Sequence, residues 1–302
     1  MKTAGTNTTT HRSPVANAAP ESGHALQRRV LDGLRAGEFC IAYQGIYRVN
    51  DGELAQMEAL IRWNHPEYGL LLPGAFCQSF ADPEVIDAVT WFVMDTVARD
   101  IAAWQHDGGA RYTVAVNVPP SVAVLPGFTE SVASICKSHD IAMECIEIEL
   151  AESEDLASFP SIGEVVRRLR ARGVNIAMDD FGTGYACLAA LGPIDFGTVK
   201  IAKELLKEAP RCPNARMVFS SVLALMSRLK VNVVVEGVET AAQAQWLAQW
   251  PHVLAQGFFL ARPTFGIDKV PGVKHANTIA RRRTLRHDHQ HLRNSMRLAD
   301  AA

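Results

Sequence analysis

The sequence predicts an α/β fold, a TIM-like (β/α)8 barrel, and two observations carry that prediction. The chain has 302 residues, 48% of them hydrophobic, which is enough for one large core, and barrels of alternating strands and helices fill this length as a single domain. Between residues 24 and 269, short apolar runs typical of buried strands alternate with longer segments of helical periodicity. Such an alternation places helices outside a parallel sheet.

The individual strands follow from eight apolar runs of suitable length. We expect strands at residues 39–48, 57–63, 112–118, 145–152, 174–181, 198–202, 231–238 and 255–260. Several of the intervening segments are amphipathic and long enough to be crossover helices, at residues 84–104, 164–173 and 215–230. The connection at residues 68–80 is longer than an average loop, so we expect it to belong to an active-site surface.

The two ends of the chain differ in composition from the middle. Residues 1–26 are rich in Thr, Asn, Ala, Ser and Pro and poor in large apolar side chains, which predicts a flexible tail. Residues 27–270 then form the barrel domain. Residues 271–302 are basic and contain three alternating histidines. We expect this second tail to be solvated, as most charge runs are, and assign no metal to it because nothing nearby completes a ligand shell.

Charge and cysteine content exclude several classes of protein. A formal net charge of -2 gives the chain no general attraction to nucleic acid or acidic membranes, so direct nucleic-acid binding is not expected. The 6 cysteines are scattered without a C-x-x-C pair, which fits reduced thiols and a cytoplasmic location. No apolar run is long enough to cross a bilayer, so we expect no membrane partner.

Polar side chains lie within the predicted strands or at their C-terminal ends, and the C-terminal face carries the active site in barrels of this type. They are Glu58, Asn117, Glu149, Glu152, Asp179, Asp180, Lys200, Glu236 and Gln256. One such carboxylate could be an ordinary surface or ion-paired residue, but apolar strands cannot repeatedly hold unpaired buried charge. Lys200 alone supplies too little positive charge for the cluster, so we expect divalent cations as its partners.

The ligand types indicate which cations and which chemistry to expect. Carboxylate and amide oxygens suit Mg²⁺ or Mn²⁺ rather than zinc. The adjacent Asp179 and Asp180 would allow one carboxylate to bridge two ions while the other binds the second ion alone. Two ions about 3.5–4 Å apart can share an activated water and stabilise both oxygens of an in-line phosphoryl displacement. The cluster therefore predicts phosphodiester hydrolysis.

The same residues lie in motifs that resemble a known family. The segments MEALIRW, EIELAES, DDFGTGY, VEGVET and QGFFLARP occur in this order, and the chain is similar over residues 27–268 to EAL-domain cyclic di-GMP phosphodiesterases. The resemblance implies a TIM-like barrel with an altered first strand (the EAL fold). It also implies an enzyme that linearises cyclic di-GMP to pGpG with Mg²⁺ or Mn²⁺, two ions per active site.

The resemblance also implies roles for individual residues. Ligands of the first ion would be Glu58, Asn117, Glu149 and Asp179, and those of the second would be Asp179, Asp180 and Glu236. Lys200 would orient the attacking water, Glu236 could act as a base, and Glu152 would hold the loop after Asp180. The residues that would support the site or contact the substrate are Gln44, Leu60, Arg62, Glu239 and Gln256.

Departures from the family pattern leave a second function open. The chain has Gly45 where the family usually has proline, and Gly197 and Ala202 where it usually has aspartate. Because Ala202 removes a carboxylate close to Lys200, turnover could be weak. The alternative is a cyclic di-GMP receptor or protein-interaction module that regulates, or represses, gene expression. A homodimer or a regulatory protein partner would then control it.

Overall fold

The computed structural model describes residues 23–151, 156–183 and 187–275. The chain divides into two compact units. Of the described residues, the larger unit holds 41–60 and those from Thr90 onward, and the smaller unit holds 61–89 and those up to Cys40. The predicted barrel core and most of the predicted site residues lie in the larger unit.

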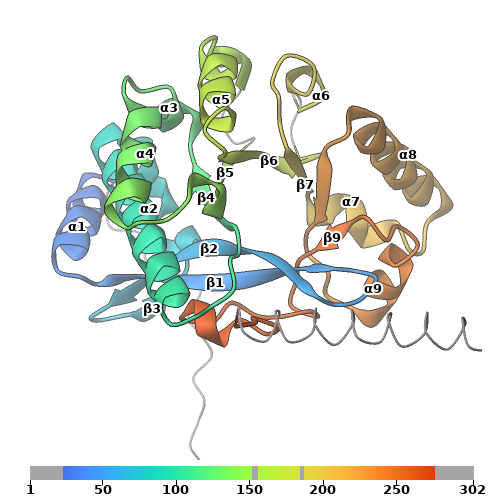
Figure 1. Ribbon diagram of the computed structural model, residues 1–302, viewed down its shortest axis with the longest axis horizontal. Helices are drawn as coiled ribbons and strands as arrows, with labels where there is room; N and C mark the ends of the chain where they lie inside the picture. Colours follow the sequence, from blue (N-terminus) through green and yellow to red (C-terminus); the bar gives the residue numbers. More distant parts are fainter. Residues whose placement is uncertain (1–22, 152–155, 184–186, 276–302) are drawn as a thin grey trace, which may run out of the picture. The chain divides into compact units, whose positions relative to one another are not determined.

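The strands of the larger unit form a closed ring. Their order is β1-β9-β8-β7-β6-β5-β4-β2, and β1 also pairs with β2, which closes the barrel. The eight strands are β1 (Phe39–Arg48), β2 (Leu54–His65), β4 (Val114–Val118), β5 (Ile146–Ala151), β6 (Asn175–Phe181), β7 (Thr198–Ile201), β8 (Asn232–Val235) and β9 (Leu254–Ala255). Neighbours from β2 through β4 to β9 are parallel, whereas β1 runs antiparallel to β9. The TIM-like barrel with an altered first strand is thereby confirmed, and β1 and β2 form its long hairpin (Figure 1).

Each of the eight predicted strands overlaps an observed one, but the last prediction was too long. The run at residues 255–260 is a strand only at Leu254–Ala255. Gly257 ends it because its Cα packs on the backbone of Val238, where a Cβ would meet the Val238 oxygen at 2.2 Å. The chain then turns, with the amides of Leu260 and Ala261 donating to the Gly257 carbonyl. Gln256 therefore follows the strand instead of lying within it.

The helices confirm the three predicted crossovers as α2 (Pro83–His106), α5 (Ile162–Arg170) and α8 (Pro213–Leu229). In α5, Ile162, Val166 and Leu169 are buried, at the spacing of one helical face. The other helices in the described part of the chain were not predicted: α1 (Gly23–Arg35), α3 (Pro120–Ala123), α4 (Phe128–Ser138), α6 (Cys187–Ala190), α7 (Lys203–Glu208) and α9 (Ala241–Leu247). Helix α1 begins inside the segment that the composition had assigned to the N-terminal tail.

The barrel interior contains a polar layer below the carboxylate cluster. Glu147 in β5 is fully buried and accepts hydrogen bonds from Gln56 Nε2 (3.1 Å), Thr198 Oγ1 (2.9 Å) and Asn175 Nδ2. These donors belong to β2, β7 and β6, so the side chains meet across the inside of the ring. Burial raises the pKa of Glu147, and the three hydrogen bonds oppose that rise.

The smaller unit is organised around aromatic side chains. Phe39 stacks on Trp63 with ring centroids 4.8 Å apart, and Phe76 meets both rings edge-on. Glu38 accepts hydrogen bonds from Trp63 Nε1 (2.8 Å) and Arg29 (2.7 Å). The long connection predicted as a loop contains a short strand, β3 (Gly69–Leu71), antiparallel to the end of β2, and the 3-10 turns η1 (Pro73–Ala75) and η2 (Cys77–Ala81).

Three further 3-10 turns, η3 (Met143–Cys145), η4 (Leu156–Ser158) and η5 (Ile267–Lys269), lie between elements of the larger unit. None of the helices in the described part of the chain has the length and apolar character required to cross a membrane.

Candidate active site and metal centre

A buried lysine stands at the centre of the carboxylate cluster. Lys200 lies in β7 and is completely buried. Its Nζ makes four ion pairs, with Glu58 (3.4 Å), Glu149 (2.9 Å), Asp179 (3.1 Å) and Glu236 (2.8 Å). Glu58, Glu149 and Asp179 come from β2, β5 and β6, and Glu236 directly follows β8. The barrel thus brings together side chains that are far apart in the sequence.

The charge states follow from burial and from this crowding. Burial lowers the pKa of Lys200, but the four carboxylates outweigh burial and hold the pKa well above its ordinary value, so the ammonium stays protonated. Burial raises the pKa of Glu149 well above its usual range, against the attraction of Lys200. Burial likewise raises the pKa of Glu236 to about 7. Burial, followed by the charge of Asp179, raises the pKa of Asp180.

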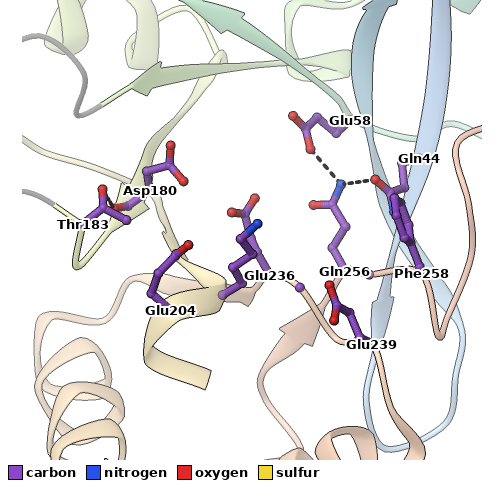
Figure 2. Close-up of a pocket in the computed structure, with 12 residues that line it drawn as sticks. Gln44, Glu58, Asp180, Thr183, Glu204, Glu236, Glu239, Gln256 and Phe258 are labelled. Atoms are coloured by element: carbon purple, nitrogen blue, oxygen red, sulfur yellow. Dashed lines mark hydrogen bonds between the residues drawn. The ribbon is translucent and has the colours of Figure 1, made fainter. Parts of the chain in front are cut away.

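Glu58 is an exception to these raised pKa values, because two side-chain amides stabilise its ionised form. Asn117 Nδ2 donates to Glu58 Oε1 (3.0 Å), and Gln256 Nε2 donates to Glu58 Oε2 (2.7 Å). Burial opposes ionisation, yet Lys200 and these two amides together lower the pKa of Glu58. Gln256 also donates to Gln44 Oε1 (3.2 Å), and Gln44 in turn donates to the Ala261 carbonyl (2.9 Å). Figure 2 shows the links from Gln256 to Glu58 and Gln44.

A strand irregularity allows two consecutive aspartates to serve the site. Adjacent side chains of a regular strand point to opposite faces. Here the register between β6 and β7 shifts between Met178 and Phe181, and Asp180 has a φ of 56°. Aspartate is among the few residues that tolerate this left-handed backbone. Ligand oxygens of Asp179, Asp180 and Glu236 consequently lie within 4.8 Å of one another.

These residues fit divalent cations. Both oxygens of Glu149 and Oδ1 of Asp179 are buried, and the described chain offers them no hydrogen-bond donor besides Lys200 Nζ, the ion-pair partner of Glu149 Oε1 and Asp179 Oδ1. Four carboxylates share the single ammonium of Lys200, which leaves excess negative charge when all four are ionised. Crowded anionic oxygens with so few donors are the environment in which a hard cation is stabilising. The cluster therefore has the donor set of a metal centre.

A cavity of about 600 Å³ opens beside this cluster. Its walls include the predicted residues Gln44, Glu58, Asp180, Glu236, Glu239 and Gln256. Several of their side chains point into the same space in Figure 2. The volume is in the range of small-molecule sites.

The cavity is also lined by six residues that the sequence did not single out as site residues: Thr183, Lys203, Glu204, Gly237, Gly257 and Phe258. Lys203 and Glu204 come within four residues of Lys200 and begin α7 directly after β7. The rule that residues following a barrel strand form the active face would have found them.

Three predicted residues stand apart from this geometry. Leu60 is half-buried in β2 and does not line the cavity. Arg62 belongs to the smaller unit, where its guanidinium donates to the Ile61 carbonyl (2.8 Å). Glu152 lies outside the described residues. Their proposed roles as substrate contacts and loop support stay predictions.

The closed barrel, parallel from β2 through β4 to β9, and the carboxylates that its strands bring together define an α/β-barrel protein with a candidate metal centre. The chain belongs to the EAL domain family, whose model matches residues 26–263.

Several curated relatives agree with this assignment. An uncharacterized signaling protein of Caulobacter vibrioides is 32% identical over 79% of this chain and 29% of its own length. The bifunctional diguanylate cyclase/cyclic di-GMP phosphodiesterase MucR of Pseudomonas aeruginosa is 29% identical over 82% of this chain and 36% of its own length. The chain thus spans only about a third of the length of these relatives. Among solved structures, the PaMucR phosphodiesterase in complex with c-di-GMP superposes with a TM-score of 0.74 at 29% identity, covering 80% of this chain and 97% of that one.

Proposed function

We propose that this protein is a phosphodiesterase that hydrolyses cyclic di-GMP to pGpG with Mg²⁺ or Mn²⁺ and so lowers this second messenger in the cytoplasm. The observation that carries the proposal is the cluster of four carboxylates around the Nζ of Lys200, beside an open cavity. The similarity to MucR, whose name includes this activity, supports the choice of substrate.

The ligand sets are assigned by the same proposal. Glu58, Asn117, Glu149 and Asp179 would hold one ion, and Asp179, Asp180 and Glu236 would hold the second. The bound cations supply an activated water and charge stabilisation for the phosphodiester. The buried carboxylate of Glu149, which has Lys200 as its only neighbouring donor in the described chain, and the close approach of Asp179, Asp180 and Glu236 support this division.

The chain's own residues then orient the reaction. Lys200, kept protonated by its neighbours, donates a hydrogen bond to the oxygen of the attacking water. Glu236 is assigned as the base that accepts a proton, and in the metal-free protein burial raises its pKa to about 7. Asn117 and Gln256 hold the Glu58 carboxylate in place. Glu239 supports the cavity wall, and Glu152 is assigned to the loop after Asp180.

A receptor that binds cyclic di-GMP and regulates gene expression, with slow or no hydrolysis, is the second candidate. Ala202 favours it: this residue is buried at the start of α7, two positions after Lys200, and offers no carboxylate. In that case the homodimer interface or the basic segment 271–302 would be the place where a regulatory partner acts.

One assay separates the two candidates. The purified chain is incubated with cyclic di-GMP and Mg²⁺ or Mn²⁺, and pGpG is measured by chromatography, with Glu58→Ala as the control. Metal-dependent pGpG formation that the control lacks supports the enzyme. Binding of cyclic di-GMP without pGpG formation rejects hydrolysis and supports the receptor.

A further inference from the structure

The cavity wall carries an uneven distribution of charge. Among the described residues that line it, the carboxylates are Glu58, Asp180, Glu204, Glu236 and Glu239. Lys203 is the one cationic side chain among them. The nearby Lys200 is completely buried and shared by four carboxylates, so its charge is already neutralised. An anionic ligand that enters the cavity therefore meets a single exposed ammonium.

Close packing fixes the position of the first side-chain atoms of Lys203. Gly237, which follows Glu236, has a φ of 66°, and a Cβ there would lie 2.2 Å from Lys203 Cβ and 3.4 Å from its Cδ. The stem of Lys203 thus rests directly on the backbone after β8. Gly182 makes the equivalent contact on the other side, since a Cβ there would lie 2.4 Å from Leu205 Cδ1.

The first turn of α7 is therefore held between two loops of the candidate metal centre. One loop directly follows β6, the strand that carries Asp179 and Asp180, and the other follows β8 and carries Glu236. Lys203 is exposed and, within the described part of the chain, has no ion-pair partner. Its position is set by glycine contacts while its ammonium stays available.

We propose that Lys203 is a phosphate-binding residue of this cavity, which donates its ammonium to a nonbridging phosphate oxygen of the nucleotide. The inference rests on the proposed function, because it takes the ligand to be cyclic di-GMP. Ammonium and phosphate form charge-assisted hydrogen bonds, and lysine binds phosphate as a point charge. Hydrolysis converts a phosphodiester into a phosphomonoester with additional negative charge at neutral pH. Lys203 consequently contributes to retention of the product as well as to binding of the substrate.

The test compares three variants of the full chain: Lys203→Gln, Lys203→Arg and the matched control Lys207→Gln. Lys207 is exposed on the same helix and does not line the cavity. Dissociation constants for cyclic di-GMP are measured with Ca²⁺ at several salt concentrations, and chromatography verifies that the ligand stays intact. Thermal midpoints of all variants confirm that each is folded.

Loss of one charge-assisted contact predicts binding about tenfold weaker in Lys203→Gln. Its affinity should also depend less on salt, because one exposed charge pair is gone. Lys203→Arg should recover most of the affinity, and Lys207→Gln should match the wild type. Equal affinity and salt dependence in Lys203→Gln and Lys207→Gln would overturn the assignment. Failure of the wild-type chain itself to bind cyclic di-GMP would instead overturn the proposed function, and this inference with it.

Discussion

Gly197 lies so close to Asn175 that a Cβ atom at residue 197 would be 1.9 Å from Asn175 Oδ1. Asn175 cannot easily move away, because its Nδ2 donates to Glu147 and to Thr198 Oγ1 (2.8 Å). Thr198 also donates to the buried Glu147 carboxylate. The polar layer of the barrel therefore leaves no room for a side chain at residue 197, although the family usually has aspartate at this position.

We expect Gly197→Asp to destabilise the protein. Overpacking against a fixed neighbour costs about 1–3 kcal/mol, and urea unfolding measures this loss directly. Gly192→Ala is the control, because the nearest atom to a Cβ there is 3.9 Å away. A Gly197→Asp variant as stable as Gly192→Ala would show that Asn175 can relax.

Periodicity and strand-end rules could predict the barrel and the carboxylate cluster. The run VNIAMDDF placed Asp179 and Asp180 correctly at the end of β6. Those rules treat each strand alone, so they could not show that Lys200 would contact four carboxylates from four separate segments. The end of β9 was missed for a similar reason. Gly257 ends that strand through its contact with Val238, a residue distant in sequence.

Replacement of Lys200 by methionine should destabilise the fold and abolish hydrolysis. Removing one partner of a buried ionic cluster costs about 3–5 kcal/mol, because the remaining carboxylates lose their counter-charge. Urea unfolding without added metal provides the measurement. The control is Lys269→Met, whose ion pair with Asp268 is exposed and screened by solvent, so its loss should change the stability little. Comparable losses in both variants would contradict a central role for Lys200.

Metal-free protein should become less stable as the pH rises from about 5 to 8. The pKa of Glu236 is raised from 4.5 to about 7, mainly by burial. A carboxyl group with a raised folded-state pKa stabilises the fold while protonated, and this contribution disappears as pH rises through the folded value. It amounts to on the order of 3 kcal/mol. Thermal midpoints in EDTA measure the effect.

Added Mg²⁺ should reduce this pH dependence, because a bound cation favours the ionised carboxylate. Glu236→Gln is the control and should show a flatter profile in EDTA. If the variant loses stability with pH as steeply as the wild type, Glu236 is not the responsible group.

Ala202→Asp should stabilise α7. Ala202 occupies the position before the helix with φ -60° and ψ 147°, and it provides no side-chain cap. A capping side chain at such a position contributes about 1 kcal/mol. Ala202→Asn provides the same cap without the charge. If the lack of a carboxylate at residue 202, near Lys200, limits turnover, only Ala202→Asp should increase the rate of pGpG formation. Failure of both variants to raise the free energy of unfolding would contradict the capping argument.

The backbone of Glu239 at the cavity wall is held by Gln243, one turn into α9. Gln243 Oε1 accepts hydrogen bonds from the amides of Glu239 (2.9 Å) and Thr240 (3.0 Å), and Thr240 Oγ1 accepts from the Gln243 amide (3.2 Å). Gln243→Ala removes the first two bonds, so we expect a loss of about 1 kcal/mol in stability. It should also weaken cyclic di-GMP binding, because Glu239 lines the cavity. Gln245→Ala, exposed on the same helix, should change neither quantity. Weakened binding in both variants would assign the effect to α9 as a whole instead of to Glu239.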